Sequence, residues 1–171
     1  PAPPLPDTDC SAETPRLTLS AARPEQLSPA LLDLGRPARV YLPLEEVSRM
    51  DALPGAGPEW CVILPRVWRD RDEPELRSRL ERARALGFTG ALLGNLGHLP
   101  LLRGMDFHLY GDYGLNVFNS RSLAYLQGKG LKSACVSFEL RFAQIRDLQK
   151  VLPTEAIVYG RLPLMITENC L

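Results

Sequence analysis

The chain has 171 residues, and at about 150 residues per domain this length predicts a single domain. Lys and Arg together number 20, as do Asp and Glu, so the formal net charge is zero. This balance excludes an overall basic surface, and the sequence carries no strong nucleic-acid signal. No apolar run approaches the roughly 18 residues that a membrane-spanning helix needs, so no membrane segment is expected.

The composition of the first 15 residues differs from that of the rest of the chain. The first 15 residues, PAPPLPDTDCSAETP, hold five of the 16 prolines and predict a flexible arm over 1–15. Residues 16–171 are predicted to form one (β/α) barrel-like domain. Because the chain begins with Pro1 and not Met, we expect that domain to be a fragment of a longer protein.

Four cysteines are spread widely along the chain, with no C-x-x-C motif. Cys61 in WCVILP and Cys135 in SACVSF lie in short apolar runs, and we expect both to be buried, reduced thiols. Cys10 falls in the proline-rich arm, and Cys170 is the second-last residue. A domain of this size can build its own core without disulfides, so we expect a reducing, cytoplasmic location.

From Arg16 onward, short apolar runs alternate with helix-like segments. The runs are nearly continuously apolar, which is typical of strands covered on both faces. Seven strands are predicted, at 17–22, 38–42, 61–65, 90–94, 107–111, 133–138 and 156–160.

Three of the intervening segments show clear helical signals. Steps of three and four between apolar residues predict one helix through Leu76, Leu80, Ala83 and Leu86. The same spacing predicts another through Phe142, Ile145, Leu148 and Leu152. Asn119 is the predicted N-cap of a helix over 120–127, with Gly128 and Gly130 as stop signals.

The signal is weaker in the first third of the chain. Leu27, Leu31 and Leu34 have helical spacing, but Pro29 would remove an N–H group inside a helix there. Between Leu44 and Glu59 no element is clear, and the PGAGP stretch at 54–58 predicts a loop.

Strands that alternate with helices predict a parallel α/β protein. A doubly wound sheet would normally show a glycine-rich turn after its first strand, and LTLSAARPEQ has no glycine there. A (β/α) barrel needs eight units and about 250 residues. We therefore expect an incomplete or truncated TIM-type barrel with about seven strands.

Polar residues follow the ends of these predicted strands. In a parallel sheet, ligand sites gather at the carboxyl ends of the strands, so the residues there are candidates for one polar pocket. Helix caps and loop salt bridges are the alternative explanation for each of them. The candidate pocket residues are Arg66, Asn95, Asp112, Asn116, Glu139, Arg161 and Glu168, with Thr167 nearby.

Familiar catalytic motifs are absent from the sequence, including G-x-S-x-G, H-E-x-x-H and the phosphate-binding P-loop. We expect His98 to be a surface or capping residue and His108 to be a packed or hydrogen-bonded strand residue. No catalytic residue is assigned. The arginines of the third helical segment are expected to form a solvated face; they are Arg77, Arg79, Arg82 and Arg84.

Four stretches resemble one protein family. GALLGNLGHLPLL, HLYGDYGLNVFNS, SFEL and IVYGRLPLMITENC are similar to the collagenase-like peptidases of unassigned catalytic type, the U32 peptidases. The resemblance is strong from Gly87 onward and looser from Arg16 to Leu86. It implies hydrolysis of peptide bonds, with a peptide or protein as the substrate.

The same resemblance implies a second activity. Some members look like iron–sulfur proteins that hydroxylate RNA bases or a quinone precursor, with cysteine ligands near the last motif. On that motif Cys170 matches one cysteine, whereas Pro163 and Tyr159 stand where the family has another cysteine and a histidine. A cubane cluster needs about four thiolates. We therefore expect no cofactor in this chain, with Cys170 a possible iron–sulfur ligand only in a longer protein.

Three functions stay open at this point: a peptidase-family domain that is inactive alone, an iron–sulfur hydroxylation protein, and a substrate-binding module without catalysis. The open edges of an incomplete barrel also predict self-association.

Overall fold

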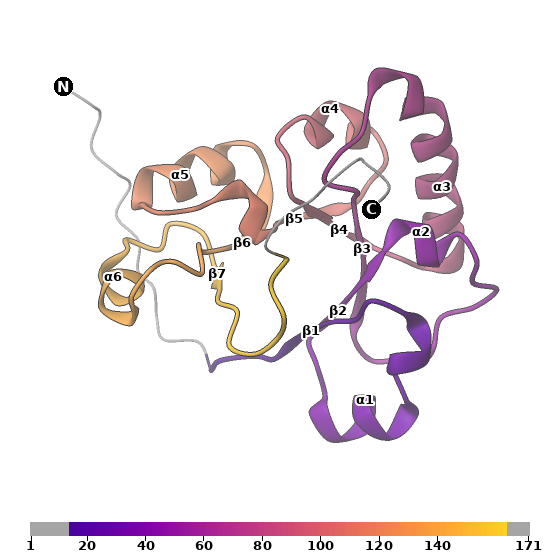
Figure 1. The fold of residues 1–171 in the computed structure, drawn as a ribbon, viewed down its shortest axis with the longest axis horizontal. Coiled ribbons are helices and arrows are strands. Elements are labelled where there is room, and N and C mark those ends of the chain that lie inside the picture. The colour runs from indigo at the N-terminus through magenta and orange to yellow at the C-terminus, as the bar shows by residue number, and fades with distance from the viewer. Residues whose placement is uncertain (1–13, 164–171) are drawn as a thin grey trace.

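The computed structural model describes residues 14–163. Its seven strands form one parallel sheet in which each strand pairs with the next one along the chain, as Figure 1 shows. The strands are β1 Thr18–Ser20, β2 Arg39–Pro43, β3 Glu59–Ile63, β4 Gly90–Leu93, β5 His108–Gly111, β6 Leu131–Cys135 and β7 Thr154–Glu155. The sheet curls into a half-barrel, which confirms the prediction of an incomplete TIM-like fold.

In the described part of the chain six α-helices connect the strands and lie in an arc around the sheet (Figure 1). They are α1 Pro29–Gly35, α2 Leu44–Val47, α3 Glu73–Leu86, α4 His98–Leu102, α5 Ser120–Gly128 and α6 Phe142–Asp147. Within 14–163 none of these helices has the length and apolar character needed to cross a bilayer.

The predicted caps explain where two of the helices begin and end. Asn119 caps α5 by accepting a hydrogen bond from the Ser122 amide at 2.9 Å, as predicted. Gly87 ends α3 with a φ of 103°, a left-handed conformation that favours glycine. Three of the four predicted apolar positions of α3 are buried, and they face the sheet.

The prediction for Pro29 was wrong. Pro29 occupies the first position of α1, where an N–H group has no intrahelical partner in any case. Ser28 precedes it as the N-cap and accepts a hydrogen bond from the Leu31 amide at 3.2 Å. The apolar spacing predicted that Leu34 would face the core. In the structure Leu34 is exposed, and Leu32 is the buried residue of the helix.

Two predictions near the C-terminal end of the domain also need correction. The last strand is Thr154–Glu155 and not 156–160, and residues 156–160 are exposed. The last helix ends at Asp147, and Phe142 is exposed, whereas Leu152 is buried outside the helix. The apolar run at 156–160 therefore gave the wrong position for β7. The residues that form this strand are those that pair with β6, namely Thr154 and Glu155.

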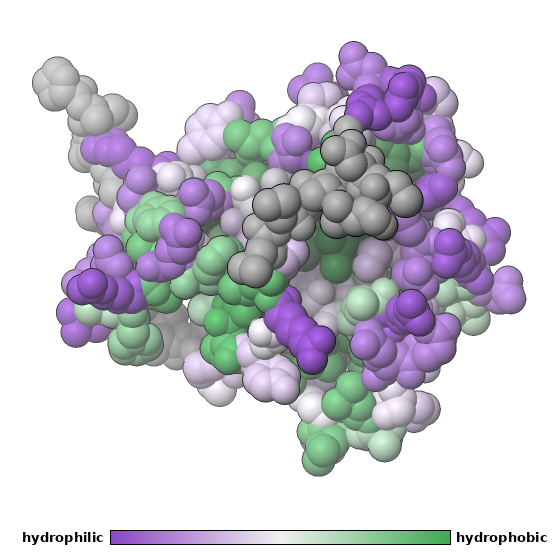
Figure 2. Space-filling view, in the orientation of Figure 1, coloured by the Kyte–Doolittle hydropathy of each residue, from purple (hydrophilic) through white to green (hydrophobic). Residues whose placement is uncertain are grey.

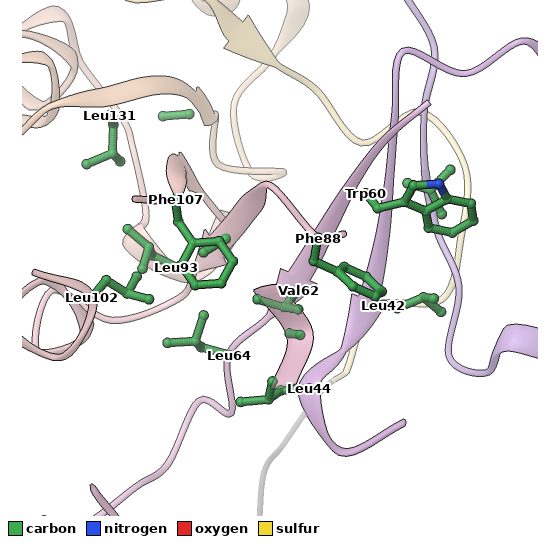
Figure 3. Close-up of a cluster of buried hydrophobic side chains, with 14 of the residues drawn as sticks. Leu42, Leu44, Trp60, Val62, Leu64, Phe88, Leu93, Leu102, Phe107 and Leu131 are labelled. Atoms are coloured by element: carbon green, nitrogen blue, oxygen red, sulfur yellow. The ribbon is translucent and has the colours of Figure 1, made fainter. Parts of the chain in front are cut away.

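The main core lies between the outer face of the sheet and the helices. Figure 3 shows Phe88 next to Trp60 and Val62, with Leu42 and Leu44 on adjoining segments. The rings of Trp60 and Phe88 meet edge to face, with their centroids 6.2 Å apart. Phe88 is completely buried.

The arginines of α3 form ion pairs along its surface rather than a binding patch. Arg77 pairs with Glu73 and Arg79 with Glu75, each one helical turn away. Arg82 donates to the Met50 carbonyl at 2.8 Å, and Arg84 lies 3.3 Å from Asp106. The predicted solvated face is confirmed.

Candidate functional site

The inner face of the half-barrel holds a polar network that draws on six of the seven strands. Its centre is Glu155 on β7, whose Oε1 accepts hydrogen bonds from Arg39 Nη1 and Ser133 Oγ, each at 2.6 Å. The Tyr41 hydroxyl lies 2.9 and 3.0 Å from the two carboxylate oxygens. Thr18 Oγ1 on β1 donates to Glu155 Oε2 at 3.2 Å. Glu155 thus joins the last strand to the first through side chains.

A second branch of the network lies nearer the amino ends of the strands. The Glu59 carboxylate accepts from the Tyr110 hydroxyl at 2.7 Å and lies 2.7 Å from His108 Nδ1. The Arg39 guanidinium lies 4.0 Å from Glu59 and stacks 4.1 Å from the centroid of the Tyr110 ring. Arg39 therefore faces two carboxylates from within the sheet.

Burial and charge together shift the pKa values of this network. Burial alone would lower the pKa of Arg39, but the Glu155 carboxylate together with Tyr41 and Tyr110 more than offsets it, so the pKa is raised and the guanidinium stays charged. Burial raises the pKa of Tyr41, and the nearby Glu155 raises it further, so the phenol stays protonated and donates. The network is a fixed ion pair with hydroxyl donors.

Above this network lies a cavity of about 620 Å³. One wall is made by residues 17–20 in and beside β1, and the opposite wall by residues 156–162, which follow β7. Tyr41, Cys135 and Glu155 form part of its lining, and Asp112 and Tyr113 line it where β5 ends. A neighbouring cavity of about 470 Å³ shares Asp112 and Tyr113 and adds Arg66. The two cavities form one depression at the carboxyl ends of the strands.

Asp112 is the acid common to both cavities. Its Oδ1 accepts a hydrogen bond from the Tyr113 amide at 2.8 Å, and its Oδ2 lies 3.8 Å from Arg66 Nη2. The Arg66 guanidinium stacks 4.2 Å from the centroid of the Tyr113 ring, while its buried Nη2 has no hydrogen bond to a described residue. Burial raises the pKa of Asp112, although the Tyr113 amide and Arg66 oppose the shift.

Glycines allow Arg66 to reach Asp112. A Cβ atom on Gly114 would lie 2.9 Å from the Gly94 carbonyl oxygen and 3.1 Å from Arg66 Nη2. A Cβ on Gly94 would lie 3.6 Å from Asp112 Oδ2. The glycine-bearing turns that follow β4 and β5 therefore leave room for the guanidinium between them.

The structure brings together three of the seven predicted pocket residues, namely Arg66, Asp112 and Arg161. Asn95 and Asn116 are exposed: Asn95 Oδ1 accepts from the Gly97 amide at 2.8 Å, and Asn116 ends a turn with a φ of 51°. Glu139 is exposed in a turn outside both cavities. Glu168 lies outside the described residues, as do Thr167, Cys10 and Cys170.

The sequence analysis missed the inward-facing members of the sheet. Arg39 and Tyr41 alternate along β2, and Glu59 and Cys61 alternate along β3, so each pair shares one face of its strand. That period of two was visible in RVYLP and EWCVI. No alternating pattern pointed to Glu155, because the last strand was predicted at 156–160 and Glu155 precedes that range.

The two described cysteines are free and buried, as predicted. Cys135 lines the larger cavity. Burial and, to a smaller extent, the negative charge of the nearby Asp112 raise the pKa of its thiol to about 12, so the thiol stays protonated near neutral pH. Within residues 14–163 no group of three or more His, Cys, Asp or Glu side chains is arranged to hold a metal ion. The described residues therefore do not fit an iron–sulfur cluster.

The prediction for His98 was wrong. His98 begins α4 and is completely buried against Trp68, with the ring centroids 6.1 Å apart. Neither ring nitrogen has a hydrogen bond of good geometry to a described residue. Burial lowers the pKa of His98, and the backbone of Pro65 offsets this only in part. His108 is exposed, so it is hydrogen-bonded as expected but not packed.

The burial of His98 predicts a pH-dependent stability. The folded protein keeps His98 neutral, whereas the unfolded chain protonates it near its ordinary pKa of about 6.5. The unfolded state therefore binds more protons below that pH, and stability falls as the pH drops through about 6.5. Urea unfolding at pH 7.5, 6.5 and 5.5 should show this loss, and His98→Leu should flatten it. A variant with the wild-type slope would disprove this role for His98.

Comparisons with known proteins agree with this fold. The sequence over residues 44–171 matches peptidase family U32. The fold is similar to that of the U32 peptidase Mk0906, with a TM-score of 0.59 and 14% identity over 89% of this chain and 71% of that one. It is also similar to the putative copper homeostasis protein CutC from Streptococcus agalactiae, with a TM-score of 0.57 and 14% identity over 82% and 87%.

No curated protein matched the sequence. At 14% identity the two solved structures show a shared fold and nothing finer. The sequence match, in contrast, covers most of the chain and includes the glycine-bearing turns around Arg66 and Asp112. The chain belongs to peptidase family U32.

Proposed function

We propose that this chain binds a peptide in the depression at the carboxyl ends of its strands, as the substrate-binding domain of a peptidase-family protein. The observation that carries the proposal is the larger cavity, whose walls combine apolar side chains with Asp112 and Arg161. Peptides need both kinds of contact, because their side chains are bound by shape and their backbone by hydrogen bonds. Membership of the U32 family supports a peptide as the ligand.

Asp112 is the group best placed to contact the peptide backbone. Its Oδ2 makes no hydrogen bond with a described residue and faces the same space as the Arg66 guanidinium 3.8 Å away. A carboxylate there accepts from a peptide amide, and Arg66 next to it donates to a peptide carbonyl. Arg161 forms no ion pair with a residue of 14–163 and offers a cation to an acidic side chain or a terminal carboxylate.

Hydrolysis of a peptide bond requires more than these contacts. Nucleophilic catalysis needs a hydroxyl or thiol beside a base, and no histidine from residues 14–163 lines either cavity. The Cys135 thiol has a raised pKa and is a poor nucleophile. We therefore expect this chain alone to bind peptides and not to cleave gelatin or peptides. Cleavage abolished by Asp112→Ala would overturn this expectation.

The peptide-binding role of Asp112 predicts a loss of affinity in Asp112→Asn. Losing a charged acceptor in a half-buried site costs about 1.5 kcal/mol, so we expect about tenfold weaker binding. Fluorescence anisotropy with a set of labelled decapeptides, chosen to span acidic, basic and apolar side chains, measures the change.

The matched control for this experiment is Glu139→Gln. Glu139 is a second acid that follows a strand, but it is exposed and lies outside both cavities, so its variant should bind like the wild type. If none of the decapeptides binds, or if both variants lose affinity equally, the proposed site is wrong.

A further inference from the structure

Within residues 14–163 the sheet has two free edges, and they face the same cavity. Among the described strands β1 pairs only with β2, and β7 pairs only with β6. A closed barrel of this type has eight strands, so the missing strand would lie between β1 and β7. Thr18 and Glu155 bridge that gap near its floor by a side-chain hydrogen bond of 3.2 Å. Above the bridge, the gap opens into the larger cavity.

The backbone of β1 presents hydrogen-bonding groups to this gap that no residue of 14–163 satisfies. Leu17 and Ala21 bond toward β2: the Leu17 carbonyl accepts from the Ala38 amide at 2.8 Å, and the Ala21 amide donates to the Tyr41 carbonyl at 3.1 Å. Alternate residues of a strand direct their N–H and C=O groups to opposite sides. Thr18 and Ser20 therefore direct theirs to the free edge, and both residues line the cavity.

The opposite wall does not satisfy these groups. After β7 the chain passes back beside β1, as Figure 1 shows, but residues 156–162 form no strand and pair with no described strand. The wall also leaves apolar side chains in solvent, because Val158 is 87% and Tyr159 97% exposed. Across the gap Leu17 is 45% exposed. Figure 2 shows hydrophobic side chains, in green, beside this segment.

We propose that a peptide binds in an extended conformation between β1 and residues 156–162, completing the sheet as an additional strand on the β1 edge. The inference rests on the proposed peptide-binding function and adds the mode of binding. Backbone hydrogen bonds to Thr18 and Ser20 hold the peptide, and Leu17, Val158 and Tyr159 contact its apolar side chains. The preferred ligand is therefore an unfolded segment with apolar side chains, and a helical or folded one is excluded.

An extended peptide is favoured over a second copy of this chain as the occupant. Two copies would have to pair through β1, a strand of three residues, or through β7, a strand of two residues. Edges this short are poor templates for pairing between folded sheets. A free peptide can enter the cavity, whereas the edge of a second folded sheet would meet residues 156–162 first.

Amide hydrogen exchange of the wild-type chain tests the mode of binding directly. The probe is the labelled decapeptide that binds most tightly in the anisotropy measurement. We expect it to slow the exchange of the Thr18 and Ser20 amides at least tenfold and to leave the amide of Gly57, in a distant loop, unchanged. Binding without protection of Thr18 and Ser20 would overturn the added-strand mode and leave the proposed function standing.

A pair of variants at Ser20 separates the backbone from the side chain. Ser20→Pro removes the N–H group that points to the free edge and keeps the pairing of Leu19 with β2, so we expect about tenfold weaker binding of the decapeptide. Ser20→Ala keeps that N–H group and should bind the decapeptide about tenfold more tightly than Ser20→Pro does. Equal affinity of the two variants contradicts the proposal.

Two further outcomes have defined meanings. If Ser20→Pro does not fold, the exchange measurement on the wild type decides alone. If the Thr18 and Ser20 amides become protected without peptide as the protein concentration rises, and light scattering shows a dimer, the occupant is a second copy and the proposal is wrong.

Discussion

Glu155→Gln should lower the free energy of unfolding by about 3 kcal/mol, because it leaves the Arg39 guanidinium half-paired inside the half-barrel. The side chains of Arg39 and Glu155 are only 15% and 17% exposed. The nearest other carboxylate is Glu59, 4.0 Å away, which keeps the expected loss at the low end of the range for buried pairs. Urea unfolding followed by circular dichroism measures the change.

The control for Glu155→Gln is Asp147→Asn, which removes an ion pair of similar length from the surface. Arg146 and Asp147 lie 2.7 Å apart, but both are mostly exposed, so little change in stability is expected. Arg39→Met combined with Glu155→Gln should lose less than the two single variants together, because the buried charge has gone. If Glu155→Gln is as stable as the wild type, Glu155 does not hold the ends of the sheet together.

Gly90→Ala should also destabilise the protein by about 3 kcal/mol, through crowding and not through lost charge. Gly90 begins β4 on the inner face of the sheet, where a Cβ atom would lie 2.3 Å from Cys61 Sγ and 2.9 Å from Tyr110 Cε2. Tyr110 cannot move away freely, because its hydroxyl donates to Glu59 and its ring stacks on Arg39. Thermal unfolding provides the measurement.

A second substitution tests that explanation for Gly90. Cys61→Ala removes the Sγ atom that the new methyl group would meet, so the double variant should recover much of the lost stability. Gly128→Ala is the matched control, because a Cβ atom there meets nothing within 4 Å and alanine favours the helix. Failure of Cys61→Ala to restore stability would place the strain at Tyr110 instead.

The elements that the sequence predicted best are those with local signals. The steps from Leu76 to Leu86 and the Asn119 cap follow from the geometry of a helix and need no knowledge of the rest of the fold. The parallel half-barrel also followed from the alternation of strands and helices. Asp112 and Arg66 were found because residues after parallel strands meet at one end of the sheet.

The predictions that failed depend on contacts between distant segments. His98 has a polar side chain and begins a short helix, so nothing local indicates that Trp68 covers it. The apolar run at 156–160 has the composition of a strand, yet β6 pairs with Thr154 and Glu155 just before it. Whether such a run is buried depends on how far the sheet curls, and single-sequence patterns do not encode that curvature.

The sequential order of the sheet has a consequence for how the protein folds. Each strand from β2 to β7 adds to the one synthesised just before it, so the sheet can grow from its N-terminal edge while the chain is being made. The bond from Glu155 to Thr18 is different, because it closes a loop of 137 residues and must wait for the last strand. Folding should therefore be limited by assembly of the sheet, and the Glu155 contacts should form after the rate-limiting step. Stability contributed by Glu155 then acts mainly by slowing unfolding.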